Sequence, residues 1–452
     1  MARDSARRGR LLRILGIGFG LAVIIGNTIG AGILRTPGVV AEHLPDPALF
    51  LGVWVAGGVY ALLGAVSIAE LGTMIPKSGG QYVFAHRALG PYAGFVVGWS
   101  DWISTCGTVA ALAIVVGEYS GSLLPSLAGK TVPVALATAA AFAVLQWRGV
   151  RWGSVAQQTT SLLKAAAFIL LIGAAFLLGS NQATIDPATA TATASEPATN
   201  ATLLAVILAL QSVIYTYDGW TGVIYFSEEV RDPRRDIPRS MFGGVLSVIA
   251  IYLLVNLALL SVLPVSKIAG DTLAVGALAK AVFGAGGDTV IRVVMIVSLL
   301  SAINACHLMA SRVLFAMSRD GLFSDRAVRV NEGGTPTVAL LVGTLVSVFF
   351  ILSGTFDQVI AVLAFFFVAS YTISFISLFV LRRREPDLPR PYKAWGYPVT
   401  TALALAGSVA FLVGAVLSDT ENSIYCALVL AASLPVYLLF KRMSFSTRHK
   451  PR

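Results

Sequence analysis

Long apolar runs divide this sequence from end to end, and they constrain its fold more than any other feature. A helix needs about 20 apolar residues to cross the hydrocarbon core of a bilayer. Twelve such runs begin near Ile14, Leu49, Tyr92, Val132, Ser154, Leu203, Met241, Ile291, Val338, Val359, Thr400 and Ile424. Only 12% of the residues are charged, against about 25% in soluble proteins. A water-soluble fold is therefore excluded, and we predict an all-α polytopic membrane protein with twelve transmembrane helices.

The basic residues predict how these helices are oriented. If the N-terminus is cytoplasmic, all but six of the 33 Lys and Arg residues fall in tails and loops on the cytoplasmic side. The exceptions are Arg35, Lys130, Lys267, Lys280 and Arg292 on the other side, and Lys164 within an apolar run. Basic residues concentrate in the cytoplasmic loops of membrane proteins. We therefore expect both termini in the cytoplasm, and topology explains the net charge of +10 without nucleic acid.

Several other classes of protein are disfavoured. Three cysteines cannot form a disulfide scaffold, and no CxxC or HExxH pattern predicts a zinc site. We expect Cys106, Cys306 and Cys426, which all lie in apolar runs, to be buried thiols. No span combines a nucleophile with a base or metal, and no sizeable soluble domain or continuous polar stripe indicates a sensor or a channel. We predict neither a cofactor nor a metal, and no enzymatic activity.

Two of the predicted helices carry glycines in the middle of their apolar run. The first reads Ile25 to Leu34 (IGNTIGAGIL), and the sixth reads Ile214 to Gly222 (IYTYDGWTG). Glycine costs about 1 kcal/mol per helical position relative to alanine, and non-helical backbone at membrane depth lines cavities or is buried in protein. Close helix packing through Gly26 and Gly30 explains the first case equally well. Because the sixth helix is interrupted in the matching position, the pair predicts an inverted-repeat transporter with its site at the two breaks.

A broken helix exposes backbone groups that can bind a zwitterion. The half-helix that starts after Gly30-Ala31-Gly32 presents unpaired N–H groups at its positive end, which can receive a carboxylate. Carbonyls near Thr28 and around Tyr215 to Tyr217 can receive an ammonium group. A ligand that satisfies both sets at once has the shape of an α-amino acid.

Two charged residues lie beside these breaks. Lys164 is in mid-span, where its insertion costs about 2.5–3.5 kcal/mol, so we expect it to face carbonyls or hydroxyls inside the bundle. It is a candidate for a cation that replaces a bound sodium ion or carries a proton. Asp218 could bind a cationic side chain, hold Lys164 or a backbone amide, or cap a half-helix. Capping and substrate contact remain open.

Five sequence blocks resemble the amino acid, polyamine and organocation (APC) superfamily, and within it the L-type amino acid transporters. They are Ile24 to Leu34, Ala69 to Tyr82, Tyr215 to Arg239, Ser311 to Phe323 and Leu381 to Val399. The resemblance implies a LeuT-like fold, in which ten core helices form two inverted repeats beside two peripheral helices. It also implies transport by alternating access.

The resemblance assigns roles to particular residues. Substrate contacts are expected from Thr28, Ile29, Gly30, Ala31 and Gly32, and from Tyr215, Thr216, Tyr217, Asp218, Gly219 and Thr221. Tyr215 matches the gating aromatic residue, and Lys164 matches the lysine that occupies the place of a sodium ion. Glu228 and Glu229 match the acidic pair that closes the sixth helix towards the cytoplasm, where arginines can pair with them.

The same reading divides the chain into segments. We expect a cytoplasmic tail over residues 1–13, a first repeat over 14–180, an extracytoplasmic loop over 181–201 and a second repeat over 202–384. Two peripheral helices over 385–440 and a cytoplasmic tail over 441–452 follow. The loop is rich in Ala, Thr and Pro and links the two groups of five helices.

Departures from the family pattern affect the substrate and partners. Family members often have serine at the position of Ala31 and asparagine at that of Thr221, which leaves fewer or altered donors here. The loop Leu123 to Val132 lacks the cysteine that joins animal L-type members to an ancillary glycoprotein, so we expect no disulfide-linked subunit. High Ala, Arg and Gly usage suggests a bacterial inner membrane. The sequence favours exchange of neutral L-amino acids; the alternative is proton-coupled uptake of cationic amino acids or polyamines, with Asp218 facing the substrate.

Overall fold

The computed structural model describes residues 11–179, 199–353, 356–418 and 420–448 of the chain. Within these ranges the regular secondary structure is helical, and the β-type pairing is confined to two isolated bridges, Leu15 with Val230 and Val330 with Pro336. The predicted all-α polytopic fold is confirmed. Most of the predicted loop 181–201, most of the predicted N-terminal tail and residues 449–452 of the predicted C-terminal tail lie outside the described residues.

The first predicted span is a broken helix. Its halves are α2 (Ile17–Thr28) and α3 (Ala31–His43), which meet at an angle of 44°. Ile29 and Gly30 between them are extended, so the backbone hydrogen bonds of the helix are interrupted at membrane depth.

Four longer helices complete the first group. The next, α4 (Pro47–Met74), starts with a proline, and the carboxylate of Asp46 accepts a hydrogen bond from the Leu49 N–H at 2.8 Å. Both features are standard at helix starts because the first N–H groups have no partner within the helix. The others are α6 (Pro91–Leu123), α7 (Thr131–Trp147) and α8 (Val150–Leu178), with the short α5 (Gln81–Leu89) and η1 (Pro125–Leu127) between them.

The second group opens with another broken element. The helix α10 (Thr199–Thr216) is followed by an irregular segment and then by η2 (Gly222–Phe226). The remaining spans are α11 (Pro233–Val262), α14 (Gly287–Arg319), α15 (Thr337–Ser353) and α16 (Phe356–Arg384). Short connecting elements are α12 (Val265–Ile268), α13 (Ala274–Phe283), η3 (Gly284–Gly286) and η4 (Asp325–Val328).

The predicted spans agree with these helices. Among the described residues, eight helices are long and apolar enough to cross a membrane alone, and the bent pair of α2 and α3 supplies a ninth span. Three further predicted runs correspond to the shorter apolar helices α7, α10 and α15. Leucines on α8 that face away from the protein are largely exposed, such as Leu170 at 72% and Leu177 at 84%, as expected for a surface in contact with lipid.

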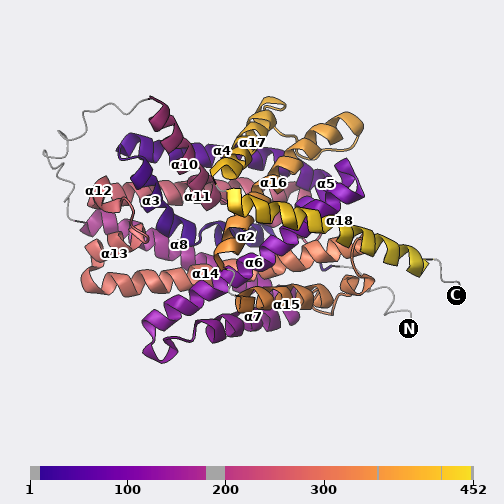
Figure 1. The fold of residues 1–452 in the computed structure, drawn as a ribbon, viewed down its shortest axis with the longest axis horizontal. Coiled ribbons are helices and arrows are strands. Elements are labelled where there is room, and N and C mark those ends of the chain that lie inside the picture. The colour runs from indigo at the N-terminus through magenta and orange to yellow at the C-terminus, as the bar shows by residue number, and fades with distance from the viewer. Residues whose placement is uncertain (1–10, 180–198, 354–355, 419, 449–452) are drawn as a thin grey trace.

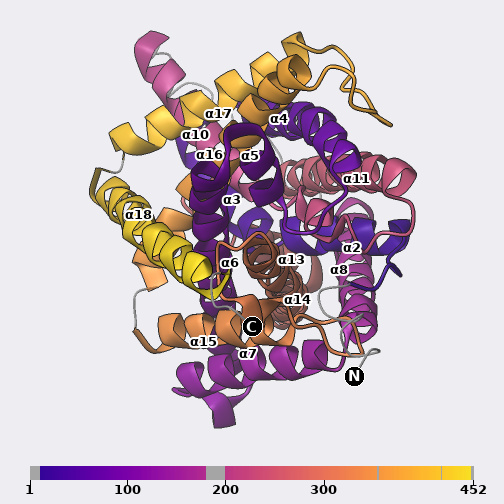
Figure 2. The ribbon, with the colours of Figure 1, turned by 90° about the vertical axis from the view of Figure 1, so that its right-hand side faces the viewer.

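Helices at matching positions in the two groups pack against each other. α4 contacts α11, α6 contacts α14, and α7 contacts α15, and Figure 2 shows α7 beside α15 at one edge of the bundle. Such pairing is expected when two repeats are related by a pseudo-two-fold axis. The last helices, α17 (Val399–Ser418) and α18 (Thr420–Arg448), lie at the periphery, where α17 contacts α4 and α16, and α18 contacts α6 and α16.

Arginines gather at one end of the bundle. We call it the basic end, because α14 and α16 both finish there with arginines, and α2 starts there. Figure 1 shows it on the right, with α5 and the end of α18, whereas α12 and α13 mark the opposite end on the left.

Candidate functional site

The first break leaves backbone donors without a side-chain partner. Gly30 is the N-cap of α3 and supplies no capping side chain, so the first N–H groups of α3 have no side-chain acceptor. A Cβ added at Gly30 would have no atom within 4 Å, which means that the backbone here borders open space. The positive end of a helix at such a point can bind an anion.

Lys164 on α8 supports the carbonyls of the same break. Its ammonium group donates to the carbonyl of Gly26 at 2.7 Å and to that of Ile29, and its side chain is fully buried. Next to it, the hydroxyl of Ser161 donates to the carbonyl of Ala22 at 2.7 Å. The prediction that Lys164 faces carbonyls inside the bundle is confirmed, and α8 thereby satisfies backbone groups that a broken helix leaves open.

The second break depends on a glycine. Gly219 has a φ of 110°, in the region that favours glycine over all other residues. A Cβ at this position would lie 2.9 Å from the backbone nitrogen of Thr28. The second break therefore lies directly against the first, and a side chain at Gly219 would separate them.

Tyr252 on α11 joins the two breaks. Its hydroxyl lies 2.7 Å from the carbonyl of Thr28 and 3.0 Å from that of Thr216. Nearby, the hydroxyls of Thr36 and Thr216 are hydrogen-bonded at 2.7 Å. The carbonyls of Thr28 and Thr216 thus already contact the phenol of Tyr252. The sequence contains no signal for this, because Tyr252 is one aromatic residue within an apolar run.

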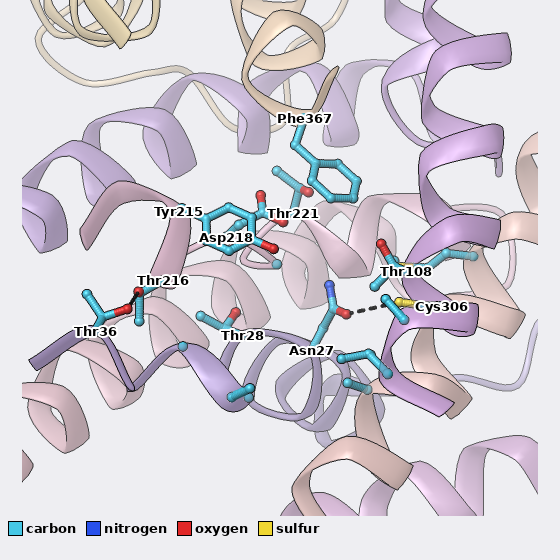
Figure 3. Close-up of a pocket in the computed structure, with 18 of the residues that line it drawn as sticks. Asn27, Thr28, Thr36, Thr108, Tyr215, Thr216, Asp218, Thr221, Cys306 and Phe367 are labelled. Carbon is cyan, nitrogen blue, oxygen red and sulfur yellow. Dashed lines mark hydrogen bonds between the residues drawn. The ribbon is translucent and has the colours of Figure 1, made fainter. Parts of the chain in front are cut away.

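A cavity of about 290 Å³ lies where the breaks meet, and Figure 3 shows part of its lining. Its size is near the lower limit of small-molecule sites. Most of the predicted contact residues line it: Thr28, Gly30, Ala31, Gly32, Tyr215, Thr216, Asp218, Gly219 and Thr221. Within the described ranges, no cluster of three or more His, Cys, Asp or Glu side chains could hold a metal ion.

Two predicted contact residues lie away from this cavity. Ile29 is fully buried, and its carbonyl accepts from Lys164. The side chain of Tyr217 packs against Trp54 and Tyr252, and its hydroxyl donates to the carbonyl of Trp54 at 3.1 Å. By contrast, Tyr215 is 38% exposed and lines the cavity beside Asp218 (Figure 3).

Asp218 is held by α16. The hydroxyl of Tyr371 donates to its carboxylate, and Tyr371 also stacks near Trp220 with ring centroids 5.0 Å apart. The sequence did not suggest this partner for Asp218, a tyrosine from the second group of helices. Both Asp218 and Tyr371 line the cavity.

Further residues of the lining were not predicted. α6 contributes Thr108, α14 contributes Cys306, and α16 contributes Phe367. Cys306 is buried as expected, yet its thiol also lines the cavity and donates to the Asn27 amide oxygen at 3.5 Å. Isolated residues in apolar runs give no indication of which helix face borders a cavity, so the sequence could not identify them.

Two ion pairs join α14 to the segment after η2 at the basic end of the bundle. Arg312 makes a bidentate contact with Glu229 at 2.9 and 3.0 Å, and both side chains are fully buried. Arg319 pairs with Glu228 at 2.7 Å. The predicted pairing of this acidic couple with arginines is confirmed. A buried pair of this kind resists separation because breaking it leaves an unpaired charge in an apolar environment.

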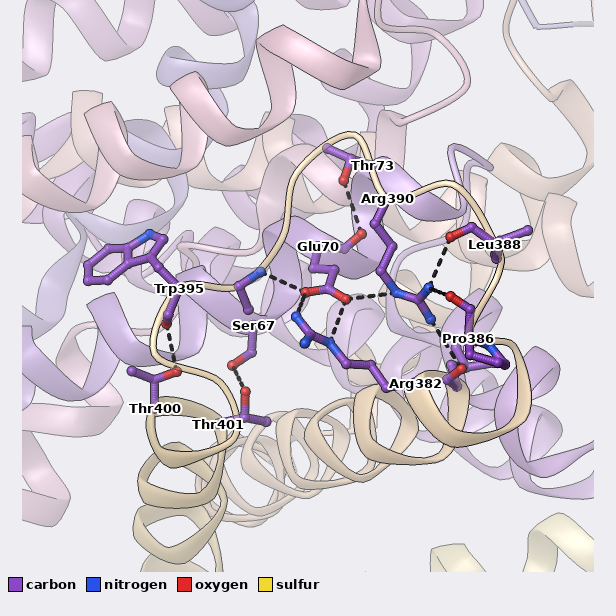
Figure 4. Close-up of polar contacts among 12 residues, drawn as sticks. Ser67, Glu70, Thr73, Arg382, Pro386, Leu388, Arg390, Trp395, Thr400 and Thr401 are labelled. Carbon is purple, nitrogen blue, oxygen red and sulfur yellow. Dashed lines mark hydrogen bonds and ion pairs between the residues drawn. The ribbon is translucent and has the colours of Figure 1, made fainter.

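A second cluster at the basic end centres on Glu70 of α4 (Figure 4). Its buried carboxylate accepts hydrogen bonds from Arg382 at 2.5 and 2.9 Å and from Arg390 at 3.1 Å. It also accepts from the Ala394 N–H at 2.6 Å. The segment between α16 and α17 is thereby attached to α4.

Comparison with known proteins gives a consistent result. A family model described as amino acid permease matches residues 20–434. The chain is 31% identical to the serine/threonine exchanger SteT of Bacillus subtilis over 96% of this chain and 98% of that protein. It is 27% identical to the mouse b(0,+)-type amino acid transporter 1, covering 96% and 89% of the two chains. With the mouse Asc-type amino acid transporter 1 it shares 29% identity over 86% and 74%.

Proposed function

Since this chain belongs to the amino acid permease family, we propose that it exchanges neutral L-amino acids across the plasma membrane by alternating access. The cavity at the junction of the two helix breaks carries this proposal. Besides Arg35 and Asp218, its lining combines hydroxyl and apolar side chains with backbone donors that have no side-chain partner, as a zwitterion with an uncharged side chain requires. The exchange named for the similar Bacillus protein supports the same conclusion.

The substrate binds across both breaks. Its carboxylate accepts hydrogen bonds from the first N–H groups of α3, next to Gly30, Ala31 and Gly32. Its ammonium group takes the remaining lone pairs of the break carbonyls, and Thr28 and Thr221 supply hydroxyls. The side chain of the substrate points towards Thr108 and Cys306. Tyr215 closes over the substrate from the end of the bundle that lies opposite the basic end, since its ring lines the cavity and is partly exposed.

Lys164 acts as a cation that holds the first break. Two carbonyl acceptors surround its ammonium group at the place where a sodium ion would need oxygen ligands. A transporter with this charge built in has no requirement for a sodium gradient. This supports exchange as its mode of transport.

The basic end faces the cytoplasm, with both termini on that side, since basic residues concentrate in cytoplasmic loops. The Glu229 and Arg312 pair and the Glu228 and Arg319 pair close the cytoplasmic exit, and they separate when the cavity opens inwards. Residues 14–180 and 202–384 form the two inverted repeats, and 385–440 hold the peripheral helices. The chain works without a disulfide-linked subunit, because the loop Leu123 to Val132 contains no cysteine.

A second candidate function is proton-coupled uptake of cationic amino acids or polyamines. One observation favours it: the Asp218 carboxylate lines the cavity and could pair with a cationic side chain. The two candidates differ in driving force and in substrate charge, so one experiment separates them.

The test is uptake of labelled neutral, basic and acidic amino acids into proteoliposomes. The vesicles are prepared with and without unlabelled amino acid inside, at equal and unequal pH. We expect uptake of neutral substrates only with internal substrate, indifferent to the pH step and to arginine or putrescine as competitors. Net uptake into empty vesicles driven by external acid would refute exchange and support the second candidate.

A further inference from the structure

Two ionised side chains, Arg35 and Asp218, line the cavity among the described residues. Asp218 is engaged by Tyr371, whereas Arg35 has no place in the binding scheme described above. Arg35 lies three residues after Gly32 of the first break and is one of the few basic residues outside the predicted cytoplasmic loops. Its charge in the wall of a site for zwitterions requires an explanation.

The position of Arg35 is set by α3. It lies four residues after Ala31, so both residues are on the same face of the helix, one turn apart. Its neighbour Thr36 is anchored to Thr216 at 2.7 Å, which orients this turn of α3 against the second break. The guanidinium therefore borders the cavity between the N-terminus of α3 and the opposite end of the bundle.

The guanidinium is available to ligands. Arg35 is exposed, and its contact within the described structure is a hydrogen bond from Nη2 to the Tyr119 hydroxyl at 3.5 Å. This distance is at the weak limit for a hydrogen bond. An arginine carries five N–H donors, and Tyr119 accepts from only one of them within the described residues. None of the ion pairs found in the described ranges involves Arg35.

We propose that Arg35 determines substrate charge: it balances Asp218 within the cavity, so that ligands with neutral side chains are accepted and cationic side chains are rejected. With both charges present, the cavity has no net charge from its lining and suits a zwitterion. Without Arg35, Asp218 leaves the cavity with a net negative charge, which favours lysine or arginine. This inference deepens the proposed function and rests on it for the identity of the ligand.

The expected effect is moderate because water at the cavity mouth screens the charge. Interaction between unit charges across a site of this size corresponds to about a three- to tenfold change in affinity. The decisive quantity is the affinity ratio of a cationic to a neutral amino acid, since all amino acids share the carboxylate that Arg35 also attracts.

The test compares Arg35→Gln and Arg35→Glu with the unmodified chain. Lys130→Glu is the matched control: this exposed lysine lies on the same predicted side of the membrane but does not line the cavity. Two readouts are used, inhibition of labelled serine exchange by L-lysine, and stabilisation of the purified protein against heat by L-lysine or L-serine. We expect the lysine-to-serine ratio to rise about three- to tenfold in Arg35→Gln, further in Arg35→Glu, and to stay constant in Lys130→Glu.

Three results would overturn the proposal. They are an unchanged ratio in both Arg35 variants, an equal loss of affinity for lysine and serine, and the same rise in the control. The thermal readout separates this inference from the proposed function. If the unmodified chain transports no amino acid, the proposed function fails, but a changed stabilisation ratio in the variants still supports the role of Arg35, and an unchanged ratio still refutes it.

Discussion

Each helix break is supported by the fifth helix of its group, but the two supporting side chains differ in chemistry. In the first group, α8 presents a cation, Lys164, to the carbonyls of Gly26 and Ile29. In the second, α16 presents a phenol, Tyr371, to the carboxylate of Asp218. Both arrangements satisfy polar groups at membrane depth, where an unpaired group is costly.

The difference between the breaks predicts different roles for them in ligand binding. The first break has its carbonyls occupied by Lys164 and leaves the N–H groups of α3 open, so it suits the anionic end of a ligand. The second break carries its own acid, Asp218, held by Tyr371 of α16, and a glycine with positive φ, Gly219. Each contrast can be tested by a substitution.

The largest effect is expected for Lys164→Met. Methionine keeps an unbranched side chain but leaves two buried carbonyls without a donor, at about 1–3 kcal/mol each. We expect amino acid exchange in proteoliposomes to fall at least about tenfold, with a lower melting temperature. Lys267→Met, at an exposed position on the connecting helix α12, is the control and should retain exchange. Normal exchange by Lys164→Met would mean that the first break holds without its cation.

A double-mutant cycle of Asp218→Asn and Tyr371→Phe measures the support of the second break. Hydrogen bonds to charged groups contribute about 1.5–3 kcal/mol, so we expect a coupling free energy in that range. The measurement is the free energy of unfolding, or the melting temperature in its place, for both single variants and the double variant. Tyr425→Phe on α18, where the ring is 41% exposed, is the control. Additive effects would show that the pair contributes no coupling.

Gly219→Ala tests the contact between the breaks. Its positive φ disfavours alanine by about 1–2 kcal/mol, and the added Cβ would lie 2.9 Å from the Thr28 nitrogen. We expect reduced exchange and a lower melting temperature. Gly173→Ala on α8 is matched to it, because a Cβ there meets no atom within 4 Å, and it should be neutral or slightly stabilising. If both variants behave alike, the close approach at Gly219 has no functional weight.

Tyr252→Phe should have the smallest effect. It removes the hydroxyl that lies between the carbonyls of Thr28 and Thr216 but keeps the ring, for a loss of about 0.5–1.5 kcal/mol. Exchange should fall by a few-fold at most, whereas Tyr92→Phe, at an exposed position of α6, should change nothing. A larger loss than in Lys164→Met would mean that the link between the breaks, and not the support of the first break, limits transport.

Much of the fold could be predicted because its signals are local. A run of apolar residues shows a span, and glycines such as Gly30 and Gly219 within it show a break, since both properties depend on neighbouring residues and on the bilayer. The buried position of Lys164 followed from the same reasoning, because a mid-span cation must find acceptors. Glu228 and Glu229 were predicted to pair with arginines, but the sequence did not identify Arg319 as the partner of Glu228 or Arg312 as the partner of Glu229.

The sequence by itself determined the twelve spans, the two breaks and the chemistry that each break exposes. Only the tertiary structure decided which side chains meet there: Tyr252 across both breaks, Tyr371 on Asp218, and Arg35 in the cavity wall. It also turned Tyr217 away from the cavity and Tyr215 towards it. The physical reason is that these contacts join helices far apart in the chain, whose rotation and depth are set by packing against several neighbours at once and not by local pattern.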